Sequence, residues 1–401
     1  TRKSRGIYAE LLLPFSKTLE VTTALRNDSY DAAKNSFNFD STGALNSPAT
    51  QGNSASKTTY KLGLRFQPSQ EILVRGSYGT GFRVPTLNDI TAPLADFGVI
   101  GTARACPVTA PDPLAPGCRP VPTQWRKLKG GNALTGEDGL KPENSEQWTL
   151  GFRLEPSRTL SMGAEFWSVK VKDVITPVPE DTAFDNFETY RSLFSVTTDP
   201  ATNRPILTFN EVPVNGAVAA SKGVDLDIMA RTDTPIGRLT SQAQVTYLFS
   251  SYFDYGFGGG KESSIGKMGS DDQVAFRTLL RLQGTLETGA FSNTLTMYWK
   301  PGYTDQTYVP ADGIIFNRNP DGSRGGAAAI SDWEVPAYYT FDWQGKWTVT
   351  KAFSVTAGIK NLLDKKPPLS IKTVGGNMVG VDPRYADIKG RTFGLAASYK
   401  F

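Results

Sequence analysis

The stretch "EQWTLGFRLEP", residues 146–156, indicates the fold class, because large apolar side chains occupy every second position within it. The apolar set is Trp148, Leu150, Phe152 and Leu154. Side chains of a β-strand point to opposite faces in turn, so this segment has one apolar face and one polar face. About ten such residues are enough for a tilted strand to cross a lipid bilayer. The segment therefore predicts a strand that separates an apolar medium from an aqueous one.

The same alternation recurs along the chain and predicts about thirteen strands of this length. They lie near 5–13, 18–27, 57–67, 70–80, 145–155, 159–172, 221–232, 239–250, 275–287, 292–300, 337–348, 353–361 and 390–401. Short turns and long loops alternate strictly between them, and the interval 81–144 shows no periodicity. The long loops lie near 28–56, 81–144, 173–220, 251–274, 301–336 and 362–389. Short turns at one end and long loops at the other are typical of an outer-membrane β-barrel.

Two other all-β architectures are possible. A soluble β-sandwich also alternates, but its strands are shorter and its turns are of mixed length at both ends. A β-propeller would show a repeat at a fixed period, and no such self-similarity is present. The strand lengths and the sorting of the loops favour an antiparallel transmembrane barrel.

Composition excludes several classes of protein. The 401 residues include no histidine, which weakens a serine-histidine triad, the common zinc sites and an imidazole base. Net charge is +4 with dispersed basic residues, so no nucleic-acid partner is expected. No apolar run approaches the roughly 18 residues of a transmembrane helix. We expect no enzyme, no metal site and no cofactor.

Two cysteines lie in "CPVTAPDPLAPGC", within the long loop 81–144. The prolines between Cys106 and Cys118 disfavour a helix, and two thiols without histidine make a poor metal site. We expect a disulfide, which implies an oxidising compartment. The first residues, "TRKSRGIYAELLLPF", lack the apolar core of a signal peptide, so an exported protein would have its N-terminus outside this sequence.

The last residues, "GRTFGLAASYKF", form an alternating strand that ends on an aromatic residue. Tyr399 and Phe401 lie on its apolar face. Terminal aromatics of this kind resemble the insertion signal of bacterial outer-membrane proteins. The alternative interpretation is an ordinary amphipathic last strand.

Four segments in order resemble the sequence boxes of TonB-dependent outer-membrane receptors. "GTGFRVPTLNDI" and "GLKPENSEQWTLGF" resemble two internal boxes, and "GIKNLLDKKPP" and the terminal segment resemble the last two. The residues that match the first two boxes are Gly81, Phe82, Arg83, Pro85, Leu140, Pro142 and Glu143. Pro85 cannot donate to a ladder and is expected where strand pairing ends.

The resemblance implies a barrel of about twenty-two strands. Residues 1–401 would then be its C-terminal portion, and the first strands and the N-terminal plug domain would lie outside this sequence. The implied function is TonB-dependent uptake of a scarce, large solute such as a ferric siderophore, cobalamin or an oligosaccharide. The implied partners are TonB, bound through a missing N-terminal segment, the missing plug, outer-membrane lipid and lipopolysaccharide, and an extracellular small-molecule ligand. The implied location is the outer membrane of a Gram-negative bacterium.

Two other functions are weighed against this one. A passive porin would lack the plug and would not need the receptor boxes. A secreted β-rich carbohydrate hydrolase could use Asp225 and Asp227, which share one face of a strand. A simpler interpretation is that both aspartates face water in the lumen.

Aromatic residues beside cations in the long loops are the candidate ligand contacts, since such sites suit anionic chelates or sugar faces. They are Trp125, Arg126, Lys127, Lys129, Tyr303, Tyr308 and Arg318. The alternative is that the aromatic residues are interfacial anchors and that the basic cluster meets lipopolysaccharide phosphate.

Overall fold

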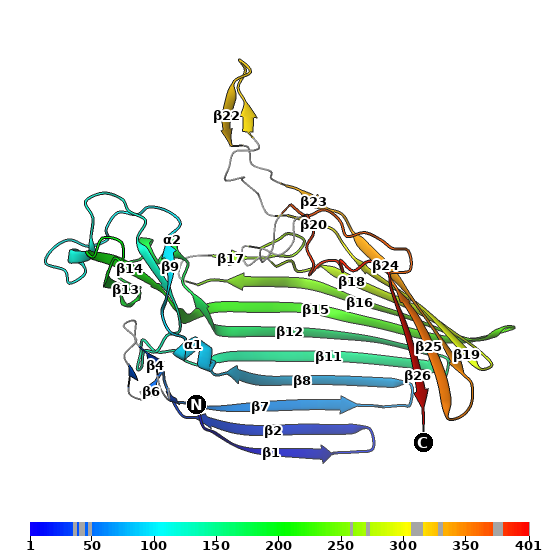
Figure 1. Cartoon of the computed structure of the whole chain (residues 1–401). Coiled ribbons are helices and arrows are strands. Elements are labelled where there is room, and N and C mark those ends of the chain that lie inside the picture. Colours follow the sequence, from blue (N-terminus) through cyan, green and yellow to red (C-terminus); the bar gives the residue numbers. More distant parts are fainter. Residues whose placement is uncertain are drawn as a thin grey trace.

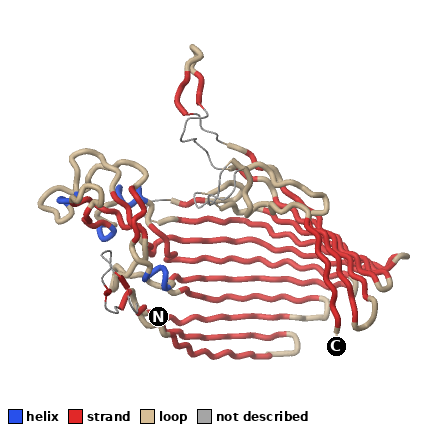
Figure 2. Tube along the Cα trace, in the orientation of Figure 1, coloured by secondary structure: helices blue, strands red, loops and turns tan. Residues whose placement is uncertain are grey.

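The structure is a computed structural model that describes residues 1–34, 38–39, 45–46, 50–256, 260–269, 273–305, 316–327, 332–371 and 380–400. Fourteen strands form one antiparallel sheet, and all of them except β17 (Lys261–Glu262) follow one another in sequence order. The ordered strands are β1 (Ser4–Pro14), β2 (Leu19–Tyr30), β7 (Ala55–Phe66), β8 (Ile72–Arg83), β11 (Glu143–Ser157), β12 (Leu160–Pro177), β15 (Pro213–Thr234), β16 (Gly237–Asp254), β18 (Thr278–Thr288), β19 (Phe291–Lys300), β24 (Tyr338–Thr348), β25 (Phe353–Lys360) and β26 (Thr392–Tyr399). Figures 1 and 2 show the sheet as a curved wall with tight turns at one end and the long loops at the other.

Smaller elements lie in the long loops. The helices are α1 (Leu87–Thr91), α2 (Glu180–Asp185) and the 3-10 turns η1 (Ala115–Gly117) and η2 (Arg191–Leu193). The strands are β3 (Ala33–Lys34), β4 (Asn38–Phe39), β5 (Leu45–Asn46), β6 (Thr50–Gln51), β9 (Ala95–Val99), β10 (Arg126–Lys129), β13 (Phe194–Thr198), β14 (Pro205–Glu211), β20 (Tyr303–Thr304), β21 (Phe316–Arg318), β22 (Arg324–Ala327) and β23 (Glu334–Val335). None of the helices in the described part of the chain is long and apolar enough to cross a membrane.

Every strand expected from the alternation is present in the expected order, so the all-β antiparallel fold is confirmed. The differences lie at the loop-side ends of three strands. β12 continues to Pro177, β15 begins at Pro213 and β16 continues to Asp254. The loops near 173–220 and 251–274 are therefore shorter than expected, because the paired ladder extends into them.

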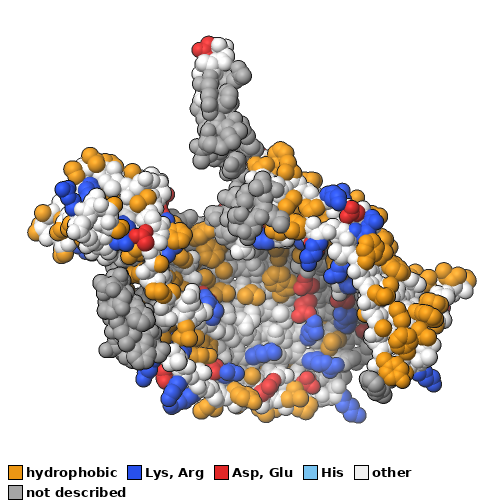
Figure 3. All heavy atoms as spheres, viewed as in Figure 1, with side chains coloured by type: hydrophobic (Ala, Val, Ile, Leu, Met, Phe, Trp, Pro, Cys, Tyr) orange, Lys and Arg blue, Asp and Glu red, His pale blue; other side chains and the backbone are white. Residues whose placement is uncertain are grey.

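The two faces of the wall differ in chemistry. Outward-pointing residues are large, apolar and exposed, such as Phe152 at 46% and Leu226 at 44%. The hollow inner face carries charged side chains of both signs (Figure 3). Arg75 pairs there with Glu165 across the strands. This division is the one that a membrane-spanning sheet requires, since lipid meets one face and water the other.

Two glycines let charged side chains lie flat against the inner face. A Cβ atom on Gly151 would lie 3.0 Å from Arg75 Nε, and one on Gly163 would lie 2.6 Å from Asp227 Oδ1. Asp227 accepts hydrogen bonds from Arg153 Nη2 at 2.9 and 3.0 Å. The arginine therefore holds the Asp227 carboxylate in an ion pair within the wall.

Substituting arginine on the two faces of β11 is expected to have unequal effects. Leu150→Arg puts a charge on the outward face and should cost about 2–4 kcal/mol near the bilayer midplane, whereas Thr149→Arg on the inner face should cost less than about 1 kcal/mol. Urea unfolding of the full-length protein in detergent micelles or vesicles would measure both. Equal costs would contradict the assignment of the faces.

Candidate functional site

Two long loops that the sequence places apart build one lobe at the loop-side end of the wall (Figure 1). The loop after β8 supplies β9 and β10, and the loop after β12 supplies β13 and β14. These strands form a sheet in the order β13-β14-β10-β9, in which β10 pairs in parallel with β14. The interval 81–144 therefore contains regular structure although its sequence shows no periodicity. Strands from a second loop complete its sheet.

Trp125 is the largest fully buried side chain of the lobe's apolar core. Its side chain is 0% exposed, and its Nε1 donates a hydrogen bond to the carbonyl of Arg104 at 2.9 Å. The residues buried in the same cluster are Ile100, Val108, Val178, Ala183, Phe187, Tyr190, Leu193, Phe194, Leu207, Phe209 and Val212. The expectation that Trp125 is an exposed aromatic contact is wrong, because the strands of both loops pack over its ring.

A disulfide closes part of the lobe. Cys106 and Cys118 are joined, with their Cα atoms 5.6 Å apart, and both pack against the apolar core. Joining residues 12 apart in sequence restricts the unfolded loop and so favours the folded lobe.

The cations of "QWRKLKG" lie on β10 and are paired within the lobe. Lys127 pairs with Glu180, and its side chain is only 13% exposed. Lys129 Nζ lies 2.8 Å from Glu211 Oε1, and Arg126 Nη2 lies 2.7 Å from an oxygen of Asp96. Each of these cations therefore already has a carboxylate partner within the lobe. Contact of these residues with a solute stays an untested prediction.

Hydrogen bonds to lobe carboxylates lower their pKa values. The Gly98 N–H and then Arg126 hold the pKa of Asp96 below its usual value, and Arg191 does the same for Asp112. A carboxylate whose pKa is depressed in the folded state stabilises that state above its unfolded pKa. These bonds should therefore persist at neutral pH and weaken as the pH falls through the lowered folded-state pKa values.

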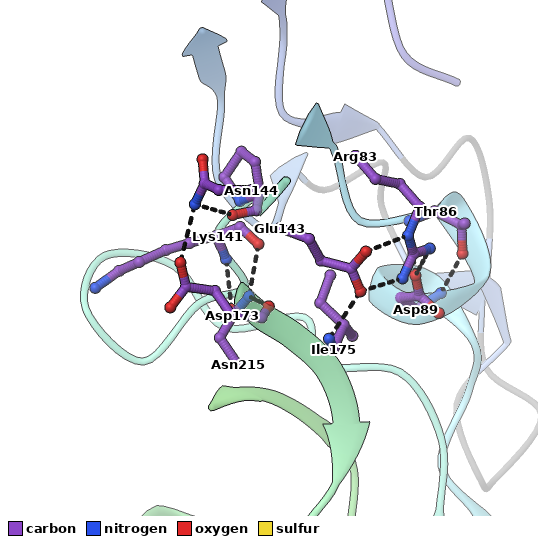
Figure 4. Close-up of polar contacts among 10 residues, drawn as sticks. Arg83, Thr86, Asp89, Lys141, Glu143, Asn144, Asp173, Ile175 and Asn215 are labelled. Carbon is purple, nitrogen blue, oxygen red and sulfur yellow. Dashed lines mark hydrogen bonds and ion pairs between the residues drawn. The ribbon is translucent and has the colours of Figure 1, made fainter. Parts of the chain in front are cut away.

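Arg83 and Glu143 face each other where the lobe leaves and rejoins the wall (Figure 4). Arg83 Nε donates to Glu143 Oε2 at 2.7 Å, and Nη2 donates to Oε1 at 2.5 Å. The Glu143 side chain is 8% exposed, and its Oε1 also accepts the backbone N–H of Ile175 at 2.9 Å. One carboxylate thus joins the loop-side ends of β8, β11 and β12. We call Arg83, Glu143 and the Ile175 N–H the loop-root clasp.

An asparagine of the next strand, β15, forms hydrogen bonds to the chain on both sides of the loop-root clasp. Asn215, on β15, donates from Nδ2 to the carbonyls of Lys141 and Asp173, both at 2.8 Å. Its Oδ1 accepts the Lys141 N–H at 2.8 Å. Asp173 has a φ of +58°, and its carboxylate accepts a hydrogen bond from Asn144 at 2.9 Å. No sequence motif pointed to Asp173 or Asn215, because their roles depend on which strands become neighbours.

The short helix α1 begins four residues after the clasp residue Arg83. Thr86 and Asp89 form a reciprocal capping box at the start of α1. Asp89 Oδ2 also lies 3.7 Å from Arg83 Nη1, so the cap adds a second acidic group beside the guanidinium. Pro85 lies just beyond the end of β8, as expected, and its carbonyl accepts a hydrogen bond from Arg2 at 2.7 Å.

The remaining box residues surround the clasp. Leu140 is 2% exposed and belongs to a small buried cluster with Ile90. Phe82 packs edge-on against Tyr30 at 6.1 Å, and the Pro142 carbonyl accepts from Asn144 at 3.3 Å. A Cβ atom on Gly81 would lie 2.6 Å from Ser145 Oγ. The residues picked out by the resemblance are thus brought together at one place.

The other candidate contacts lie elsewhere. Tyr303 is 1% exposed in a second buried cluster with Tyr385, so the expectation that it is an exposed aromatic contact is wrong. Burial raises the pKa of Tyr303, and it raises that of Tyr385 to about 12. Arg318 is the last residue of β21, and Tyr399 is 62% exposed on β26. Tyr308 and Phe401 lie outside the described residues.

Solved structures with a similar fold were found over the whole chain. The siderophore receptor PirA from Acinetobacter baumannii matches with a TM-score of 0.62 at 14% identity. A variant of the ferric enterobactin receptor PfeA from Pseudomonas aeruginosa matches at 0.59 and 17%, and the copper transporter OprC at 0.55 and 15%. All of this chain is covered in each case, but it spans only 46%, 45% and 48% of those chains. No curated protein matched.

The model of one protein family also matches, over residues 1–362. Its description is TonB dependent receptor-like, beta-barrel. The match includes the strands on both sides of the clasp and the whole lobe. The chain therefore belongs to the TonB-dependent receptor-like β-barrel family.

Proposed function

We propose that this chain is the C-terminal portion of an outer-membrane receptor that takes up a scarce, large solute by a TonB-dependent route. The observation that carries the proposal is the two-faced wall with structured loops at one end only. Its outer face suits lipid, its inner face suits a polar occupant, and its lobe can meet a solute outside the cell. A plug domain and a TonB-binding segment, supplied by another part of the protein, belong to this proposal.

The proposed cargo is a ferric siderophore, cobalamin or an oligosaccharide, in a Gram-negative bacterium. Of the solved structures with this fold, one is named a siderophore receptor, one a ferric enterobactin receptor and one a copper transporter. Those names describe proteins of low identity, so they support the class of activity and leave the cargo open.

Energy coupling is the property to test. Cells carrying the full-length protein are given labelled ferric enterobactin, cyanocobalamin or oligosaccharides, with and without a protonophore that collapses the proton gradient. We expect surface binding of one solute to survive the protonophore and its uptake to stop. Uptake that continues without the gradient would instead support a passive channel, and we would abandon TonB coupling.

A further inference from the structure

A pocket of about 230 Å³ lies at the loop-side ends of β15 and β16. Its walls come from residues 219–221 of β15, and from residues 251–253 and 255 at the end of β16. Residues 262, 264, 269 and 273–275 contribute further lining, including Glu262 on β17, which pairs with β16. The pocket therefore lies at the rim of the hollow, where a solute entering from the loop side would pass.

The pocket's strand residues face the lumen. Ser221 lies four residues before Asp225 on β15, so the two side chains are on the same face of the strand. The hydroxyls of Ser221 and Ser251 lie 2.8 Å apart, so Ser251 is on the same side of the sheet. Phe253 and Tyr255 follow at two-residue steps, and their rings meet edge to face with centroids 4.7 Å apart. The lumen face at this rim thus combines a pair of hydroxyls with a pair of aromatic rings.

The charge of the lining is the informative feature. Among the described lining residues none is lysine or arginine, and Glu262 is the one charged side chain. An anionic chelate would lose its hydration here without gaining a cation from these lining residues. The cations of β10 are no substitute, since they are paired with carboxylates of the lobe.

We propose, building on the uptake function above, that this pocket binds a neutral, hydroxyl-rich ring, the chemistry of a carbohydrate. The apolar face of a sugar ring can pack on Phe253 and Tyr255, while its hydroxyls exchange hydrogen bonds with Ser221 and Ser251. A small number of polar groups in a partly aromatic pocket is the usual composition of a small-molecule site. Of the cargo classes left open, the oligosaccharide is the one whose whole length carries such rings.

The test uses the full-length receptor in detergent on an array of neutral and acidic glycans, followed by calorimetry with each glycan that binds and with ferric enterobactin. We expect a neutral glycan to bind and Phe253→Ala to weaken it by about tenfold or more. Phe249→Ala is the matched control, because Phe249 lies on the same strand, is 46% exposed and packs with the outward-facing Phe166. Ser251→Ala is a smaller change that should also weaken binding. It provides the test if the Phe253→Ala protein fails to fold.

The outcomes separate the inference from the function on which it rests. Failure of every neutral glycan to bind, tight binding of ferric enterobactin alone, or equal binding by the Phe253→Ala and Phe249→Ala proteins would each overturn the inference and leave TonB-dependent uptake standing. A neutral glycan that binds through Phe253 but enters cells without a proton gradient would keep the pocket and overturn the coupling.

Discussion

Replacing Trp125 by alanine is expected to unfold the lobe and leave the wall of strands intact. The indole is fully buried among residues from both long loops, and large-to-small changes of buried aromatic residues cost about 3–5 kcal/mol. The change also removes the donor to the Arg104 carbonyl. The lobe joins the wall only at a few strand ends and has little other buried core to compensate for the lost free energy. We therefore expect the lobe to unfold locally.

Hydrogen exchange of the full-length protein would measure this directly. Peptides from β9, β10 and β14 should exchange much faster in the Trp125→Ala protein, and peptides from β11 and β12 should not change. Trp125→Phe keeps most of the ring volume and loses only the indole N–H, so it should cost about 1–2 kcal/mol. Trp148→Ala is the matched control, because Trp148 is 43% exposed on the outward face of β11.

The same experiment separates a packing role from a ligand contact. If Trp125 served mainly to touch a solute, its removal would lower affinity and leave exchange in the lobe unchanged. That result would contradict the burial described above.

Alternation predicted the wall because each of its strands meets lipid on one side only. Leu150 faces lipid and must be apolar, whereas Thr149 faces the lumen and need not be. Apolar residues therefore recur at every second position. The predicted strand began eight residues too late on β15, because "PVNGAVAA", residues 213–220, has small residues on both faces and so shows little alternation. Backbone pairing with β12 and β16 extends that strand although its side chains there show no alternating pattern.

The lobe could not be predicted in this way, because its strands are short and partly buried on both faces. β14 has three consecutive buried residues, Leu207 to Phe209, so burial does not alternate along it. Its parallel neighbour β10 comes from a different loop, and such long-range pairing leaves no local signal. Trp125 was misread for the same reason: a tryptophan beside cations suggests an exposed contact until the strands that cover it are known.

The clasp was predicted in part. Arg83 and Glu143 were picked out by family resemblance, but a sequence does not show that they form a pair. The register of β8 against β11 creates that pair, since it places the two residues directly opposite each other. The Ile175 N–H has no sequence signal at all, because any residue would supply it.

Arg83→Ala is expected to destabilise the loop-side ends of β8, β11 and β12 by about 3 kcal/mol, because it leaves a buried carboxylate without its cation. Glu143 is 8% exposed and would keep only the Ile175 N–H among its clasp partners. Glu143→Gln should cost less, about 1–2 kcal/mol, since the amide oxygen can still accept from Ile175 and no buried charge remains. The Arg83 side chain is 49% exposed and can be solvated without its partner.

This asymmetry makes the double variant the decisive measurement. Adding Glu143→Gln to Arg83→Ala should restore part of the lost stability, because it removes the stranded charge. The exposed pair Glu146 and Lys172 on neighbouring strands is the control, with side chains 47% and 44% exposed, and Lys172→Ala should cost less than about 1 kcal/mol. Unfolding midpoints and exchange at residues 141–145 and 173–176 would report all four proteins. If the double variant were less stable than Arg83→Ala alone, the explanation by a buried, unpaired charge would be wrong. The clasp would then stabilise the loop-side strand ends through the geometry of its hydrogen bonds.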